Sequence, residues 1–250
     1  MSRGRVAICA LIAMFTLFAA LAGPAMAKKE YKKEFEASSS EVKLETQSVG
    51  ANSVYEFKFP FEEKGKGFAT KKAKCTEIAK ADGEIHTVEG KAQSFTDKIT
   101  FGGCETEKKA NKHEIKVSPM EFEFHANGTF SILNEVKFQF STNCTLVVDS
   151  GQVVGGEEVE EGKRGPVAYS QIGQSPPNGI PKVEAKVKTR THEAGEVDGL
   201  EYEGEGGDCE NSEHKFEGGK FSGNFLIHAK STKENPWIGF KEELLPKEKM

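Results

Sequence analysis

Arginine, aspartate and tryptophan are scarce in this chain of 250 residues. It has 4 Arg against 30 Lys, 5 Asp against 34 Glu and a single Trp, with a formal net charge of −5. Dedicated nucleic-acid-binding proteins show a basic patch that contains arginine, because the planar guanidinium group binds phosphate through paired hydrogen bonds. The composition therefore argues against nucleic acid as a partner.

Motifs of catalysis and of cofactor binding are also missing. The sequence has no P-loop, no G-x-G-x-x-G that opens a helix, no H-E-x-x-H and no G-x-S-x-G nucleophile elbow. The segment Gly219–Gly223 comes nearest to the elbow, but its serine stands one residue too late. We therefore expect neither an enzyme activity nor a cofactor.

The N-terminus has the features of an export signal. Two arginines precede the apolar run Val6–Ala22, and a small-residue cleavage site of the A-x-A type follows at Ala25 and Ala27. We predict that residues 1–27 are a signal peptide and that the mature protein begins at Lys28. The alternative is an uncleaved membrane anchor. A membrane-spanning helix requires about 20 apolar residues and is not followed by such a cleavage site. The prediction places the protein outside the cell, secreted and without a further membrane span.

Export changes the meaning of the cysteines. After cleavage four remain: Cys75, Cys104, Cys144 and Cys209. None forms a C-x-x-C pair and no histidine stands at ligand spacing from them, which argues against a zinc site. An even number of scattered cysteines in an oxidising compartment predicts two disulfides. Four cysteines allow three connectivities, and the residues alone do not choose among them.

Apolar residues recur with a period of two rather than 3.6. The alternation with polar residues is clear in four segments, Tyr55–Phe61, Val136–Phe140, Lys182–Lys188 and Phe221–Ala229. Strands with one apolar and one charged face are typical of antiparallel sheets that are wet on the outside. We therefore predict an all-β protein with an antiparallel, β-sandwich-like body in two β halves.

One hairpin is specified in detail by the segment Glu121–Ile132. A two-residue turn at Asn127 and Gly128 would place its phenylalanines on different faces of the hairpin. A three-residue loop, Ala126–Gly128 with Gly128 in the left-handed region, instead pairs Phe124 with Phe130 and Phe122 with Ile132. The hydrophobic phase selects the second arrangement, a type I turn followed by a G1 bulge.

The expected organisation follows from these segments. It is a signal peptide (1–27), a charged leader or edge strand (28–50), a first β half (51–150), a second β half with long loops (151–240) and a charged tail (241–250).

Five short segments occur in an order that resembles a group of uncharacterised exported bacterial proteins with a β-rich body. They are Phe101–Cys104, Glu121–Ile132, Cys144–Val148, Val167–Gly173 and Gly218–Gly223. The resemblance covers roughly Tyr55–Lys230 and implies a fold and an export route, but no activity. Members of the group often carry another cysteine pair around the central hairpin, where this chain has residues near Met120 and Leu133.

The disulfide pairing that we favour is Cys75–Cys104 with Cys144–Cys209. It keeps each bridge within one segment, and the pattern of the group agrees with it. The pairing Cys104–Cys144 with Cys75–Cys209 stays open, because the order of the strands is not known from the sequence.

Candidate functional residues are few. His125 beside the hairpin turn is the histidine that we single out. The strand glutamates Glu121 and Glu123, and the acidic segment Asp198–Glu210 with Glu201, Glu203 and Glu205, could supply a carboxylate pair. The acidic segment lacks the spacing of an EF-hand, so we expect no tight calcium site there. The cluster of lysines between 28 and 33 could contact anionic envelope polymers.

Two functions remain after this survey. We expect a non-catalytic exported protein that binds an envelope component, another exported protein or an extracellular ligand through its loops. The alternative is an extracellular hydrolase that uses two carboxylates and acts on sugars. A concave site with two converging glutamates would favour the hydrolase, and glutamates spread over outer faces would favour the binding protein.

Overall fold

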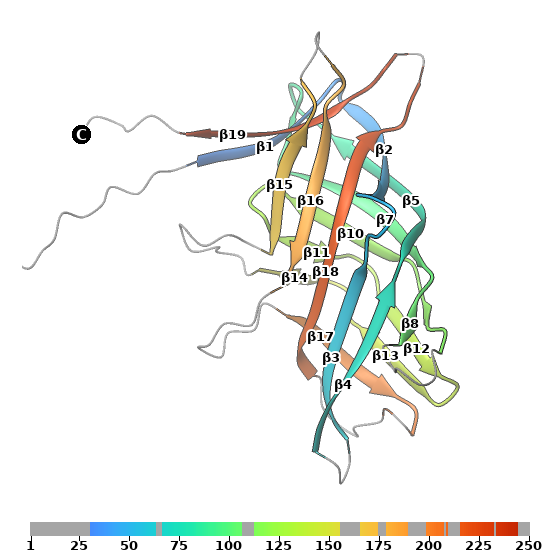
Figure 1. Ribbon diagram of the computed structural model, residues 1–250. Coiled ribbons are helices and arrows are strands. Elements are labelled where there is room, and N and C mark those ends of the chain that lie inside the picture. Colours follow the sequence, from blue (N-terminus) through green and yellow to red (C-terminus); the bar gives the residue numbers. More distant parts are fainter. Residues whose placement is uncertain are drawn as a thin grey trace, which may run out of the picture. The chain divides into compact units, whose positions relative to one another are not determined.

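The structure is a computed structural model, and it consists of strands joined by turns and loops (Figure 1). It describes residues 31–63, 67–106, 113–155, 166–174, 179–189, 199–207, 209, 216–232 and 234–244. The predicted signal peptide, with Ala25 and Ala27, lies outside the described residues, and so do the predicted first mature residue Lys28 and the end of the predicted tail from residue 245. Residues Tyr31–Glu243 form one compact unit.

The strands are β1 (Tyr31–Ala37), β2 (Glu41–Ser48), β3 (Tyr55–Glu63), β4 (Gly67–Cys75), β5 (Glu77–His86), β6 (Lys91–Ala92), β7 (Ser94–Gly102), β8 (Glu105–Thr106), β9 (Lys116–Val117), β10 (Met120–His125), β11 (Phe130–Ile132), β12 (Val136–Ser141), β13 (Cys144–Val148), β14 (Gln152–Val154), β15 (Val167–Ile172), β16 (Lys182–Lys188), β17 (Leu200–Glu205), β18 (Phe216–Ala229) and β19 (Ile238–Leu244). The described residues contain no helix, which confirms the all-β prediction. The strand pairs among the described residues are antiparallel, and β19, β1 and β6 form a small sheet beside the main one.

The long strand β18 is the centre of the main sheet. Along one edge it pairs with β17 and β16, and along the other edge with β3 and β2. From β2 the sheet continues through β5, β7 and β10 to β11 and β14, and from β17 through β13 to β12 and β9. Strands from the ranges 51–150 and 151–240 therefore pair directly. The described part of 28–50 forms β1 and β2, each with a strand on both sides.

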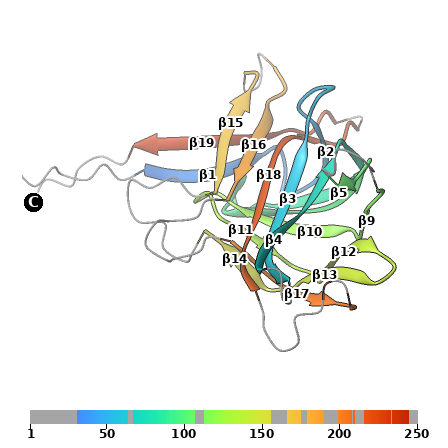
Figure 2. The same cartoon turned by 60° about the horizontal axis from the view of Figure 1, so that its bottom comes forward.

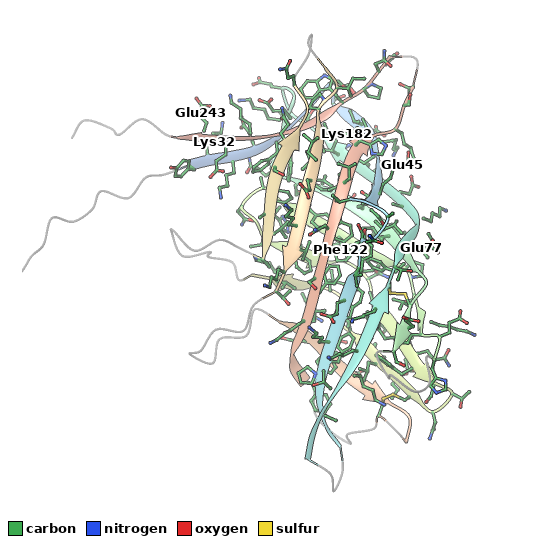
Figure 3. All side chains as sticks on the ribbon, viewed as in Figure 1. Lys32, Glu45, Glu77, Phe122, Lys182 and Glu243 are labelled. Carbon is green, nitrogen blue, oxygen red and sulfur yellow. A yellow bond between two sulfur atoms is a disulfide. The ribbon has the colours of Figure 1, made fainter. Side chains whose placement is uncertain are left out.

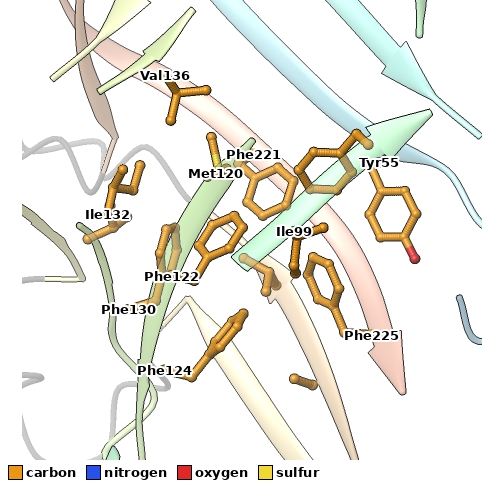
Figure 4. Packing of buried hydrophobic residues seen from close by; sticks show 14 of the residues in the cluster. Tyr55, Ile99, Met120, Phe122, Phe124, Phe130, Ile132, Val136, Phe221 and Phe225 are labelled. Carbon is orange, nitrogen blue, oxygen red and sulfur yellow. The ribbon is translucent and has the colours of Figure 1, made fainter. Parts of the chain in front are cut away.

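The core is a cluster of phenylalanine rings between two facing parts of the curled sheet (Figures 2 and 4). Phe122 and Phe124 on β10 contact Phe221 and Phe225 on β18, with ring centroids 5.7 Å apart for Phe122–Phe221 and 5.9 Å for Phe124–Phe225. Burying one such side chain stabilises a fold by about 1.5–3 kcal/mol. Alternate residues of these strands face water, which gives the sandwich-like arrangement predicted from the period of two.

The hairpin of β10 and β11 has the predicted register. Phe122 is opposite Ile132 and Phe124 is opposite Phe130. Gly128 has a φ of 94°, a conformation that a residue with a Cβ rarely adopts. Asn127 accepts a hydrogen bond from the backbone N–H of Thr129 at 3.0 Å. The loop therefore has the three residues that were predicted from the need to place the apolar side chains of both strands on the same face.

Two disulfides join distant strand ends in the connectivity favoured above. Cys75 at the end of β4 is bonded to Cys104 after β7, with a Cα–Cα distance of 3.9 Å. Cys144 at the start of β13 is bonded to Cys209 after β17, with a Cα–Cα distance of 4.9 Å. All four side chains are buried and belong to the core cluster. Among the described residues, no helix is long and apolar enough to cross a membrane.

Candidate functional site

A groove lies where the neighbours of β18 change along one edge. β2 pairs with Phe225–Ala229 and β3 pairs with Lys220–Ser222, so the segment between these strands leaves the sheet beside β18. This segment, Val49–Val54, is called the β2–β3 loop below. The groove has a volume of about 690 Å³ and is lined by the β2–β3 loop, by Lys186–Lys188 of β16 and by Ser222–Asn224 of β18.

The groove has one apolar wall and a polar floor. In the loop, Val49 and Val54 are exposed, with 37% and 47% of their surface accessible. The floor carries outward-facing side chains, among them Ser222 and Asn224. Ligand sites usually combine an apolar lining with a few polar groups in a cleft of about 300–1,000 Å³. Both the size and the chemistry of the groove fall in this class.

Tyr55, which is buried beneath the floor of the groove, contacts the backbone of β18 and the end of β2. Its hydroxyl donates a hydrogen bond to the carbonyl oxygen of Asn224 at 3.1 Å and lies 3.0 Å from Ser48 Oγ at the end of β2. A Cβ at Gly223 would lie 2.6 Å from the Tyr55 ring, so glycine is needed for this close approach. Burial raises the pKa of Tyr55, which keeps its hydroxyl protonated as a donor. The two ends of the β2–β3 loop are thereby tied to β18.

The β16 side of the groove is positively charged. Lys186 forms an ion pair with Glu184 at 3.5 Å, with 56% of the lysine side chain accessible. Lys188 is exposed and forms no ion pair with any residue that the structure describes. Lys182, at the far end of the same strand, and Glu45 of β2 both lie near His228 of β18 (Figure 3). An anionic or strongly polar ligand would therefore find cations at the rim.

His125 contacts a serine and a carboxylate on the outer face of β10 and β11. Its Nε2 lies 2.8 Å from Ser131 Oγ and 4.0 Å from a carboxylate oxygen of Glu123. In a serine hydrolase the carboxylate binds the ring nitrogen that faces away from the serine, and so orients the histidine. Here both contacts involve the same nitrogen. The arrangement therefore does not match a catalytic triad.

The glutamates singled out in the sequence lie on outer faces. Glu121 and Glu123 face outward from β10, and Glu201, Glu203 and Glu205 are exposed on β17. In the predicted acidic segment Asp198–Glu210, the residues Asp198, Asp208 and Glu210 lie outside the described residues. No group of three His, Cys, Asp or Glu in the described part of the chain could hold a metal ion.

A smaller groove of about 210 Å³ does collect carboxylates over β5, β7 and β10. Asp82, Glu84, Asp97 and Glu121 line it. Lys230 lies 2.6 Å from Asp82, and Lys43 is paired with Glu84. The hydrogen bonds to these lysines lower the pKa of both carboxyls. A glycosidase acid needs a raised pKa, which neither Asp82 nor Glu84 has.

Asp97 is the carboxyl with a strongly raised pKa, and it is shut inside the core. It is 1% exposed and lies on the inward face of β7, opposite Gly83 on β5 and Phe122 on β10. Its Oδ2 accepts a hydrogen bond from Thr46 Oγ1, whereas Oδ1 has no partner among the described residues. Burial raises the pKa of Asp97 to about 6. Asp97 also lines the 210 Å³ groove, but with 1% of its surface accessible it offers no open carboxyl there.

Sequence reasoning missed both the groove and Asp97. The signal for Asp97 was the alternation Phe95, Asp97, Ile99, Phe101, which places an acid in an inward position. For the groove, the alternation of Lys186 and Lys188 with apolar residues indicated a solvent-exposed face of this strand. Nothing in the sequence tells which loop covers that face, because strand order is a long-range property.

The fold and the groove together define a β-sandwich-like protein with two disulfides and a loop-covered cleft on its outer face. No known protein family, curated protein or solved structure matches this chain.

Proposed function

We propose that this chain is an exported, non-catalytic protein that binds a component of the cell envelope in the groove under its β2–β3 loop. The groove itself carries the proposal. It combines exposed apolar side chains with lysines and neutral polar groups in a volume suited to part of a glycan or a peptide. The glutamates that the sequence singled out, by contrast, lie on outer faces, and Asp97 is buried.

Export is supported by the signal features of residues 1–27 and by the two disulfides. Disulfides persist in oxidising compartments and are rare where thiols are kept reduced. We expect the secreted form to begin at Lys28. N-terminal mass spectrometry of the secreted protein checks this, and a chain that begins before Ala25 and stays in the membrane would contradict it.

The groove predicts where a substitution abolishes binding. Asn224→Tyr places a ring on the floor from an exposed strand position, where it fills the groove without changing the core. We expect capture of the purified mature protein on isolated bacterial cell walls to fall at least about tenfold, which corresponds to roughly 1.4 kcal/mol. Co-sedimentation with the walls measures the bound fraction.

The matched control is Gln139→Tyr, at an exposed position of β12 far from the groove in the strand order. It adds the same ring to a strand and should leave capture unchanged. Equal capture of both variants, or a wild-type protein that stays in the supernatant with every wall preparation, would refute the proposed function.

A further inference from the structure

Lys188 is a cation without a partner at one end of the groove. It is exposed at the end of β16, and no ion pair or side-chain hydrogen bond joins it to the part of the chain that the structure describes. Lys186, in contrast, is paired with Glu184 at 3.5 Å. An anionic group that enters the groove from this side therefore finds the uncompensated ammonium group of Lys188.

The backbone at Lys188 is held from both sides. Its N–H donates a hydrogen bond to the carbonyl oxygen of Pro166 at 2.7 Å. The next residue, Thr189, donates its N–H to the carbonyl oxygen of Phe221 at 3.0 Å and accepts the Phe221 N–H on its hydroxyl at 2.9 Å. The base of the lysine side chain is therefore fixed, so less freedom is lost when the ammonium group binds a ligand.

Two polar side chains of β18 lie beside the two lysines of the groove. Ser222 is opposite Lys188 and Asn224 is opposite Lys186, and the inward residues between them are buried. A carboxylate at Lys188 can therefore also accept a hydrogen bond from the Ser222 hydroxyl. The side-chain amide of Asn224 offers a donor and an acceptor, which match the C=O and the N–H of a peptide group.

The spacing of these side chains fits an extended peptide. Ser222 and Asn224 follow one another on the same face of β18, at a distance of roughly 6.6 Å along the strand. Two residues of an extended ligand span about the same length. A peptide whose terminal carboxylate lies at Lys188 therefore places an earlier peptide group at Asn224.

The wall of the groove suits small aliphatic side chains. The β2–β3 loop leaves the sheet here, so no strand residue stands opposite Gly223 and Asn224 on this edge of β18. The loop lines the open side with Val49, Ala51 and Val54. Among the described lining residues there is no aromatic ring on which a sugar could stack. The lining therefore favours a peptide over a glycan.

The described acids beside the groove are compensated. Glu56 of β3, which is opposite Ser222, lies 2.5 Å from Lys58 and 4.0 Å from Lys74. Glu184 is paired with a lysine of its own strand. Their charges therefore repel a carboxylate at Lys188 only weakly.

We propose that the groove binds the end of a peptide, a segment of small aliphatic residues with a free terminal carboxylate. This inference rests on the proposed function and adds the chemical class of the envelope component. The carboxylate pairs with Lys188 and accepts a hydrogen bond from Ser222. The preceding peptide group contacts Asn224, and the aliphatic side chains pack against Val49 and Val54.

The test is an NMR titration of the mature protein with acetyl-Ala-Ala-Ala, once with a free terminal carboxylate and once as the amide. We expect the acid to shift the backbone signals of Lys188 and Asn224, and the amide to bind about fivefold more weakly, which is the contribution of one well-placed exposed ion pair. Lys188→Gln should lose the preference for the acid, whereas Lys188→Arg should keep it.

The control variant Lys116→Gln removes the same charge from an exposed position of β9 and should bind the acid like the wild type. Two results would overturn the inference. Equal affinities of the wild type for the acid and the amide would show that no carboxylate is recognised. Equal losses in Lys188→Gln and Lys116→Gln would assign the preference to net charge alone.

A second experiment separates this inference from the proposed function. Cell walls from which an amidase has removed the peptides should no longer capture the mature protein. If they capture it as well as intact walls do, and Asn224→Tyr abolishes that capture, the groove binds another part of the wall. In that case this inference fails and the proposed function stands.

Discussion

At the scale of single residues, Asp97 is the group whose chemistry departs furthest from expectation. An acid among Phe95, Ile99 and Phe122 loses its hydration, and one hydrogen bond from Thr46 does not replace it. Nearby, Asp82 raises the pKa of Asp97 further and Lys230 lowers it, but burial is the largest cause. Through its hydrogen bond with Thr46 the Asp97 carboxyl links β7 to β2 beside Gly83 of β5. Ionisation of this buried carboxyl lowers the stability of the fold.

The sign of the pH dependence follows from the raised pKa. The native state holds its proton up to about pH 6, whereas the unfolded state releases it near 3.8, so folding takes up a proton between these values. The free energy of unfolding from this group therefore falls as pH rises through 6. The total loss is on the order of 3 kcal/mol, of which about 1 kcal/mol falls between pH 5 and 7.

Asp97→Asn should remove this dependence. We expect the difference in unfolding free energy between wild type and variant to change by about 1 kcal/mol from pH 5 to pH 7, in favour of the variant at the higher pH. Urea unfolding at several pH values measures it. Parallel curves for the two proteins would show that Asp97 does not titrate in this range.

At the scale of elements, the sequence predicted what is local and periodic. The hairpin of β10 and β11 was predicted down to its register because a slip by one residue would turn every phenylalanine to the other face. The inward phase of Phe221, Phe225 and Ile227 in β18 was predicted for the same reason. Period and turn chemistry suffice when both strands of a pair are adjacent in the chain.

The partners of β18 could not be predicted in this way. This strand pairs with β2, β3, β16 and β17, whose residues lie as far as about 180 positions away in the chain. The period of two gives each strand a face but does not choose its neighbours. The groove depends on that choice, because it forms where β2 ends and β3 begins beside β18. The candidate site was therefore beyond the reach of the sequence.

At the scale of the whole molecule, two disulfides add to the stability that the buried aromatic core provides. The chain-entropy model gives upper values of about 3.6 kcal/mol for a 29-residue loop and about 4.3 kcal/mol for a 65-residue loop. Their sum is comparable to the net stability of an ordinary domain. The frame closed by these bridges can therefore tolerate a costly buried acid.

The asymmetry of charge also belongs to this scale. Glutamates line the outer face of β10 and β17, whereas lysines gather on β16, β18, β3 and β4. Part of the lysine charge on these strands is compensated by Glu56 and Glu184. Charge patterns of this kind orient a partner before contact and are weakened by salt.

The most direct test of the central claim is amide hydrogen exchange of the mature protein with and without saturating soluble cell-wall fragments. The account predicts slower exchange in Val49–Val54 and in Lys186–Lys188, because a bound ligand covers the groove and restrains the loop. Exchange in the hairpin Val136–Val148 should not change. Protection confined to that hairpin, or no protection at all under conditions in which the fragments bind, would contradict the assignment of the groove as the binding site.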